Sequence, residues 1–224
     1  MIESWNDFPL ALQVEDLLRG QGMDPASPRS RRPAFLRAAE AALERGLPLL
    51  QPAAVLRTCQ VLDYHHERIR LEEGVELAGS LIGTCLAGAR QVAAVLCTIG
   101  PQLETEVSGE QDALLALALD GLGNAAVGSI AQQVCARVAE QAQSAGLQTS
   151  TPLSPGEPEW PVDVGQKQIF SLLENQALPI RLNEGQMMIP KKSISFVLGI
   201  GPQMTQTGMC ELCSLNERCR YRHG

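Results

Sequence analysis

The stretch EQDALLALALDGLGNAAVGSIAQQVCARVAEQAQSA, residues 110–145, carries the longest periodic pattern in the chain. Apolar or small residues recur there at intervals of three and four, which is the spacing of one face of an α-helix. Three of them, Gly121, Ala125 and Gly128, are small enough to let another backbone approach closely. We therefore expect one long helix that carries a buried packing seam.

Shorter patterns on both sides predict a mixture of helices and strands. Helices are expected over residues 10–19, 33–46 and about 164–174, with a short one ending near residue 86. Strands are expected over residues 54–64, 67–77, 92–98, 178–182 and 193–201. Because the two kinds of element follow no regular βαβ period, we predict an α+β fold with a largely antiparallel twisted sheet and flanking helices.

Charge and composition narrow the class of protein. The 224 residues have a formal net charge of -7, which argues against electrostatic binding to nucleic acid or to an anionic membrane. Four arginines cluster around a proline-rich joint, and we interpret them as solvated surface. No signal peptide or membrane span is predicted, and the seven cysteines fit a reducing compartment, so we expect a cytoplasmic protein. The clustered arginines are Arg29, Arg31, Arg32 and Arg37.

The segment LSPGEPEWPVDVGQKQIF, residues 153–170, is rich in proline. Proline fixes φ and donates no backbone hydrogen bond, so this segment is predicted to be a shaped loop. Asp163 and Gln166 have the spacing of a capping box, which predicts that Asp163 is the N-cap of the following helix. Such a stiff corner either turns the chain or presents backbone groups to a ligand.

Four motifs in this order resemble the activation domain of vitamin B12-dependent methionine synthase. They are CTIGPQLE (97–104), LALDGLGNAAV (117–127), the proline-rich corner and MMIPKKSISFVLGIG (187–201). The resemblance spans roughly residues 14–201, and it is to a stand-alone version of the domain. We therefore expect an activation-domain-like unit over residues 1–205, followed by a tail over residues 206–224.

The resemblance implies a function in methyl transfer. In that family an inactive cob(II)alamin takes one electron and then a methyl group from S-adenosylmethionine. The chain would accordingly be an accessory factor that reactivates a cobalamin-dependent methyltransferase, a methionine synthase in particular. Its partners would be the corrinoid protein that carries the cobalamin and an electron donor protein. Because methyl transfer to Co(I) needs positioning rather than an acid or a base, no catalytic residue is predicted.

The resemblance also places the ligand site. It implies that S-adenosylmethionine is bound by Ser154, Pro155, Gly156 and Glu157, and near Ser193 on the last strand. The family's binding motif is an Arg, three further residues and Gly-Tyr.

This chain keeps the glycine of that motif but has Pro152 and Glu157 at the other two places. The alternative is thus a non-catalytic module that binds a corrinoid protein and has lost the S-adenosylmethionine site. Glu157, Glu159 and Asp163 either attract a sulfonium or ribose hydroxyls, or form a solvated acidic loop.

The tail CELCSLNERCRYRH has the pattern C-x2-C-x5-C-x3-H. Three thiolates and one imidazole at such short spacings suit a tetrahedral zinc ion. An iron–sulfur cluster is the other interpretation, with Cys59 or another cysteine as the fourth ligand. The predicted metal ligands are Cys210, Cys213, Cys219 and His223.

Two further sets of residues are weaker candidates. Asp63, His65 and Glu67 alternate along an expected strand, either as potential ligands or as ordinary half-exposed strand residues. Cysteines in apolar segments are interpreted as small buried hydrophobic residues, and two lysines before the last strand as solvated. These residues are Cys85, Cys97, Cys135, Lys191 and Lys192.

Overall fold

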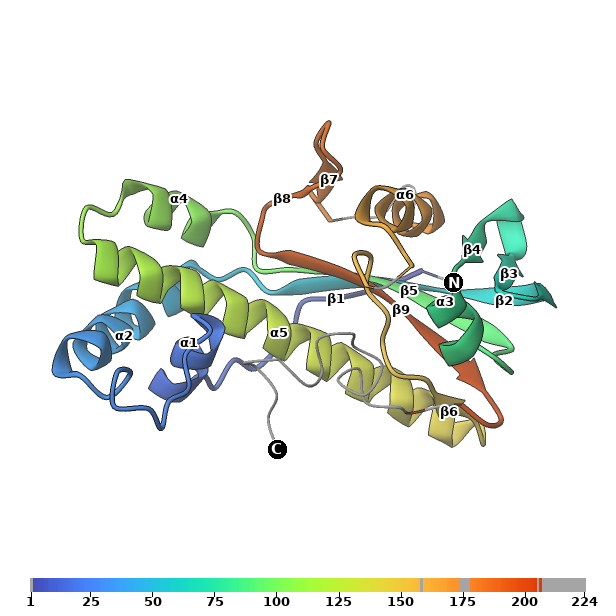
Figure 1. Cartoon of the computed structure of the whole chain (residues 1–224), viewed down its shortest axis with the longest axis horizontal. Helices are drawn as coiled ribbons and strands as arrows, with labels where there is room; N and C mark the ends of the chain where they lie inside the picture. Colours follow the sequence, from blue (N-terminus) through green and yellow to red (C-terminus); the bar gives the residue numbers. More distant parts are fainter. Residues whose placement is uncertain (1, 158, 174–177, 205, 207–224) are drawn as a thin grey trace.

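The computed structural model describes residues 2–157, 159–173, 178–204 and 206. Helices and strands are interspersed along it (Figure 1). The helices are α1 (Val14–Gly20), α2 (Pro33–Gly46), η1 (Leu47–Leu49), η2 (Glu72–Gly74), α3 (Ser80–Cys85), α4 (Gln102–Gly109), α5 (Ala113–Ser144) and α6 (Val162–Leu172). The strands are β1 (Ile2–Trp5), β2 (Ala53–His65), β3 (Arg68–Leu71), β4 (Glu76–Ala78), β5 (Gln91–Thr98), β6 (Gln148–Thr149), β7 (Arg181–Leu182), β8 (Met188–Ile189) and β9 (Ser193–Gly201).

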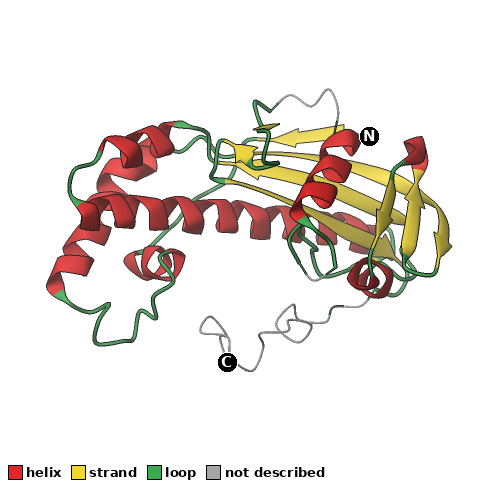
Figure 2. Cartoon of the chain, turned by 45° about the horizontal axis from the view of Figure 1, so that its top comes forward, coloured by secondary structure: helices red, strands yellow, loops and turns green. Residues whose placement is uncertain are grey.

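The main sheet is antiparallel throughout and has the order β4-β3-β2-β5-β9-β6, with β1 paired to β2 outside this path. Strand β2 changes partners along its length. Its first half pairs with β1 and β5, and its second half pairs with β3 around a bulge between Val61 and Asp63. A bulge bends the strand and increases its twist, so the sheet curls (Figure 2). The predicted α+β fold with a largely antiparallel sheet is confirmed.

The two faces of the sheet are covered by different helices. Along β9, Phe196 and Leu198 belong to the core that includes α5, whereas Val197 belongs to the core formed with α3 and α6. Neighbouring residues belong to different cores because successive side chains along a strand point to opposite faces of the sheet. Figure 1 shows α5 with α1 and α2 on one side of the sheet and α6 on the other.

Helix α5 is the predicted long helix, and α1 crosses it in backbone contact. A Cβ atom added at Gly20 would lie 2.2 Å from the carbonyl oxygen of Gly121, and one added at Gly121 would lie 2.7 Å from that of Leu17. Only glycine permits such an approach. The expected packing seam therefore exists at Gly121, but it does not continue to Gly128, where an added Cβ would meet nothing within 4 Å.

By length and mean hydropathy, α5 is also the one described helix that could cross a membrane. Core helices of soluble proteins satisfy the same criterion. Ten residues of α5 are buried. Most of them, among them Leu119, Ile130 and Val134, pack in the core against the sheet. Asn124, on the same helix, donates from Nδ2 to the carbonyl oxygen of Gly20 at 2.9 Å. In this fold α5 is the central core helix.

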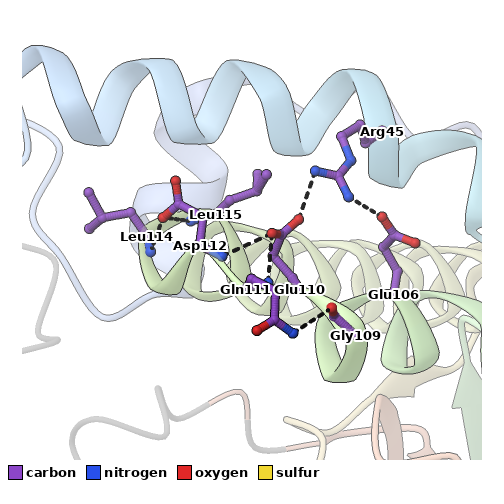
Figure 3. A network of polar contacts seen from close by, with 8 residues as sticks. All are labelled: Arg45, Glu106, Gly109, Glu110, Gln111, Asp112, Leu114 and Leu115. Carbon is purple, nitrogen blue, oxygen red and sulfur yellow. Dashed lines mark hydrogen bonds and ion pairs between the residues drawn. The ribbon is translucent and has the colours of Figure 1, made fainter.

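The last turn of α2 is tied to the start of α5 by a polar network (Figure 3). Arg45 forms ion pairs with Glu106 and, at 2.7 Å, with Glu110. The Glu110 carboxylate also accepts from the backbone N–H groups of Gln111 and Asp112. Hydrogen bonding from Asp112 and then from Arg45 lowers the pKa of Glu110. The network fixes the sharp turn between α4 and α5.

Several elements differ from the expectation. Helix α1 begins at Val14 rather than near residue 10. The strand expected over residues 67–77 is divided into β3, η2 and β4, because Gly74 has a φ of +79° and turns the chain. The strand expected over residues 178–182 is reduced to β7, which pairs with β8 in a separate two-stranded sheet. Strands β1 and β6 and helix α4 were not predicted.

Candidate functional site

The proline-rich corner lies against β9, on the sheet face opposite α5. Leu153 and Val197 exchange two backbone hydrogen bonds, of 3.0 and 2.9 Å. Leu153 and Trp160 are fully buried in the core of that face. The indole nitrogen of Trp160 donates to the side-chain oxygen of Gln168 on α6 at 2.8 Å. The corner is thus fixed at both ends, as its proline content predicts.

The turn of the corner requires glycine at its centre. Gly156 has a φ of +100°, and its N–H donates to the carbonyl oxygen of Trp160 at 2.8 Å. A Cβ atom added there would lie 3.0 Å from Cγ2 of Val162. Glu157 closes the turn by donating its N–H to the carbonyl oxygen of Ser154 at 3.2 Å. Ser154, Pro155, Gly156 and Glu157 therefore form one compact unit.

Helix α6 begins two residues earlier than predicted, and the capping-box prediction is wrong. The N-cap is Pro161, no side chain caps the helix, and Asp163 is its second residue. Pro161 has the extended backbone that precedes the first residue of a helix. The negative charge of Asp163 in the first turn still stabilises the helix, because the helix N-terminus carries a partial positive charge. Gln166 is buried and accepts a hydrogen bond from Ser195 Oγ at 3.0 Å. Its role is to join α6 to β9.

Pro155 packs directly on α6. A Cβ atom added at Gly165 would lie 2.8 Å from Cβ of Pro155 and 2.8 Å from the indole ring of Trp160. This close packing holds the start of α6 against the corner. Val162 and Val164, on the exposed side of that first turn, have 37% and 43% of their surface accessible. The corner therefore presents an apolar rim to the outside.

The acidic residues of the corner are in different environments. Glu159 is exposed, has a φ of +63°, and its carboxylate accepts hydrogen bonds from the N–H and the hydroxyl of Ser80 at the start of α3. The interpretation of Glu159 as part of a solvated loop is thus incomplete, because it also fastens the corner to α3.

Glu157 is half-buried instead. Its Oε2 atom is buried, and no group in the described part of the chain hydrogen-bonds it. Burial raises the pKa of Glu157 to about 6, and a hydrogen bond from the backbone of Ser154 opposes the shift. The charge of Glu157 also contributes, after burial, to the raised pKa of the Cys85 thiol. The corner therefore holds a carboxyl group that changes charge near pH 6.

Ser193 lies on the same sheet face as the corner but further along β9. Its Oγ lies 2.7 Å from the carbonyl oxygen of Pro190 and 2.9 Å from Oγ1 of Thr98. Ser193 and Val197 are four positions apart in the strand, which is about 13 Å at 3.3 Å per residue. Ser195 and Gln166 lie between them and complete a polar row that we did not predict. The sequence did contain a sign of this row. Serine alternates with apolar residues in SISF, residues 193–196, and this alternation places both serines on one face of the strand.

The other candidates give no second site among the described residues. Strand β2 ends at His65, so Glu67 lies in the following turn and does not continue the alternation. Asp63 and His65 are exposed and line a hollow of about 320 Å³ with the ion-paired Arg68 and Arg70. Within residues 2–157, 159–173, 178–204 and 206, no group of three or more metal-binding side chains is present. Cys210, Cys213, Cys219 and His223 lie outside the described residues.

The remaining thiols behave as the sequence predicts. Cys85 and Cys97 are buried, and Cys135 is half-buried. Burial raises the pKa of Cys97, and it raises that of Cys135 to about 11. Thiolates are therefore scarce at neutral pH, and these side chains act as small apolar groups. Of the two lysines, Lys191 is exposed and pairs with Glu104, but Lys192 is largely covered and pairs with Asp120 at 2.7 Å.

Fold and site together define a curled antiparallel sheet with one long core helix behind it and a rigid proline–glycine corner in front. No protein-family model matches the sequence, and no curated protein matches it. Among solved structures, the chain is similar to the MetH reactivation domain bound to AdoHcy. The TM-score is 0.64 over 93% of this chain and 81% of that one, at 14% sequence identity. The resemblance predicted from the sequence is confirmed at the level of the fold.

Proposed function

We propose that this protein is an accessory factor in the reductive reactivation of a cytoplasmic cobalamin-dependent methyltransferase, a methionine synthase in particular. The observation that supports it most is the likeness to the MetH reactivation domain over 93% of the chain. That domain was solved with AdoHcy, which is S-adenosylmethionine without its methyl group. The same four motifs support the assignment from the sequence.

In the proposed reaction, the chain has to hold the methyl group of S-adenosylmethionine in line with the cobalt of the cobalamin that accepts it. Cobalamin, carried by the partner protein, supplies the nucleophile, and a separate donor protein supplies the electron. The corner from Ser154 to Glu157, together with the row that ends at Ser193, would bind and orient S-adenosylmethionine. A corner held by paired backbone hydrogen bonds is preorganised, so little order has to be gained on binding. The apolar rim of Val162 and Val164 is suited to contact the corrinoid protein.

Pro152 favours a second candidate function. An arginine at this place could hold the methionyl carboxylate through two parallel hydrogen bonds, and proline has no side-chain donor. The second candidate is a module that binds a corrinoid protein without S-adenosylmethionine. The two functions differ in a single measurable property, which is the response to the small ligand.

Titration calorimetry with S-adenosylmethionine and with AdoHcy, each with and without a cobalamin-binding methionine synthase module, tests the proposal. Gly156→Ala should weaken ligand binding at least tenfold, because the added Cβ clashes with Val162 and the backbone is strained. Gly74→Ala is the matched control, since Gly74 has a φ of +79° and open space around it. Equal affinities of the two variants would show that the corner is not the site. Binding of the partner without any response to either ligand would establish the second candidate.

We further propose that the tail over residues 206–224 binds one metal centre. Cys210, Cys213 and Cys219 would be ligands of zinc with His223, or of an iron–sulfur cluster that could pass the electron to the corrinoid. Anaerobic purification with metal analysis separates the two, because a cluster gives a brown protein with iron and sulfide. Cys213→Ser should release the metal, whereas Cys135→Ser, in α5, should leave it bound. Absence of both metals from the purified protein would refute the proposal.

A further inference from the structure

Four arginines at one end of the molecule have no partner in the described part of the chain. All four are exposed, and their side chains take part in no ion pair or hydrogen bond there. Two other exposed arginines, Arg90 and Arg181, likewise have no side-chain partner in the described part of the chain, so the feature of these four is that they lie together around one turn and the start of α2. The four are Arg29, Arg31, Arg32 and Arg37; the arginines with partners include Arg19, Arg45, Arg68, Arg70 and Arg137.

The loop that carries three of these arginines is fixed in place. Ser30, between them, is fully buried, and its Oγ lies 2.6 Å from the carbonyl oxygen of Asp24 and 2.9 Å from that of Ser27. The Asp24 carboxylate accepts from the N–H of Ala26 at 2.9 Å. A proline-rich turn with a buried serine therefore holds the arginine backbones in one arrangement. Guanidinium groups carried by a fixed backbone and free of other partners are available to pair with carboxylates.

An apolar hollow adjoins the fourth arginine. It has a volume of about 260 Å³ and lies between α2 and the first turn of α5. Leu114 and Leu117 on α5 have 37% and 43% of their surface exposed. The Asp112 carboxylate at the hollow is occupied by the N–H groups of Leu114 and Leu115, as Figure 3 shows. The hollow is lined by Ala34, Arg37, Ala38, Ala41, Asp112, Leu114 and Leu115.

We propose that these arginines and this hollow form a docking surface for an acidic segment of a partner protein. Carboxylates of the segment would pair with the guanidinium groups, and an apolar side chain would enter the hollow. A protein fits this surface better than a nucleic acid, because exposed leucines contribute little to phosphate binding and the whole chain has a net charge of -7. We name this docking surface the arginine face.

The arginine face is separate from the proline-rich corner. Figure 1 shows α2 and the N-terminal end of α5 at one end of the molecule, away from α6. The corner packs on the sheet face that α5 does not cover. A segment docked on the arginine face would therefore leave the corner open, and the inference holds whether or not the corner binds S-adenosylmethionine.

The test uses the full chain and a labelled synthetic helical peptide with glutamates on one face and leucines on the other. Fluorescence anisotropy should show binding that weakens steeply with salt. The triple variant Arg31→Gln, Arg32→Gln, Arg37→Gln should weaken it at least tenfold. Leu114→Ser, which changes the lining of the hollow, should weaken it to a smaller degree. The matched control, Arg68→Gln with Arg70→Gln on the β2–β3 hairpin, should change the affinity less than twofold.

Other outcomes would overturn the inference. Equal binding by the triple variant would show that the arginines are ordinary solvated surface. Equal affinity for a peptide with serine in place of leucine, or for duplex DNA, would show a general anion surface rather than a protein dock. Concentration-dependent dimerisation abolished by the triple variant would show that a second copy of the chain occupies the surface.

Discussion

Glu157 provides a direct test of the corner's electrostatics. Replacing it with glutamine keeps the shape of the side chain and removes its charge. Burial raises the pKa of Glu157 from an ordinary value of 4.5 to about 6. That difference corresponds to about 2 kcal/mol at 1.36 kcal/mol per pKa unit. Because the carboxyl group is only half-buried, solvent screening reduces the expected value to about 1 kcal/mol.

The sign follows from proton linkage. The folded state holds the proton more tightly than the unfolded state, so the wild-type protein loses stability as the pH rises from 4.5 to 6. The stability of Glu157→Gln relative to wild type should therefore increase by about 1 kcal/mol between pH 4 and pH 7.5. Any constant contribution from the amide cancels in this comparison.

Urea denaturation at a series of pH values measures the effect. With a slope of about 2–3 kcal/mol/M, the difference between the two midpoints should change by about 0.3–0.5 M over the series. Glu40→Gln, at an exposed position on α2, is the control for the same change in net charge. If the difference between the urea midpoints of variant and wild type stays constant across the whole pH range, Glu157 is solvated and our description of the corner is incorrect.

Three further predictions concern α5 and its contacts. Asp112→Ala should remove the N-cap of α5 and cost about 1 kcal/mol, a fall of about 2–4 °C in Tm, while Asp112→Asn should retain most of the stability. Gly121→Ala should destabilise the protein in thermal denaturation because its Cβ meets the Leu17 carbonyl, whereas Gly128→Ala, in open space on the same helix, should stabilise it by about 0.5–1 kcal/mol. Glu110→Gln should lower stability at neutral pH, and the difference should shrink as the pH falls from 4.5 through the lowered pKa of Glu110, because its ionised form is the stabilising one. A difference that stays the same size from neutral pH into the acid range would contradict this last assignment.

Local patterns predicted the long elements well. The helix over residues 110–145 and the strands over 92–98 and 193–201 appear as α5, β5 and β9 with nearly the expected bounds. Their apolar residues repeat with a single clear period, and that period depends only on backbone geometry. The prolines of the corner likewise exclude regular structure wherever the segment lies. The prediction of a shaped loop there was correct for this reason.

Short elements and side-chain partners were not predictable in the same way. Strands β1 and β6 have four and two residues and form only because β2 and β9 offer free edges. Gln166 has the spacing of a capping residue, yet it bonds Ser195, which lies 29 residues away in the chain. Such contacts depend on how distant segments meet.

The sequence alone determined the kind of fold and the position of the rigid corner, because these depend on φ preferences and local period. Tertiary structure decided the environment of each functional group. It placed Glu157 in a half-buried setting, joined Glu159 to α3 and separated Ser193 from the corner along β9. Solvation and charge pairing are properties of the folded surroundings, and residues far apart in the chain create those surroundings.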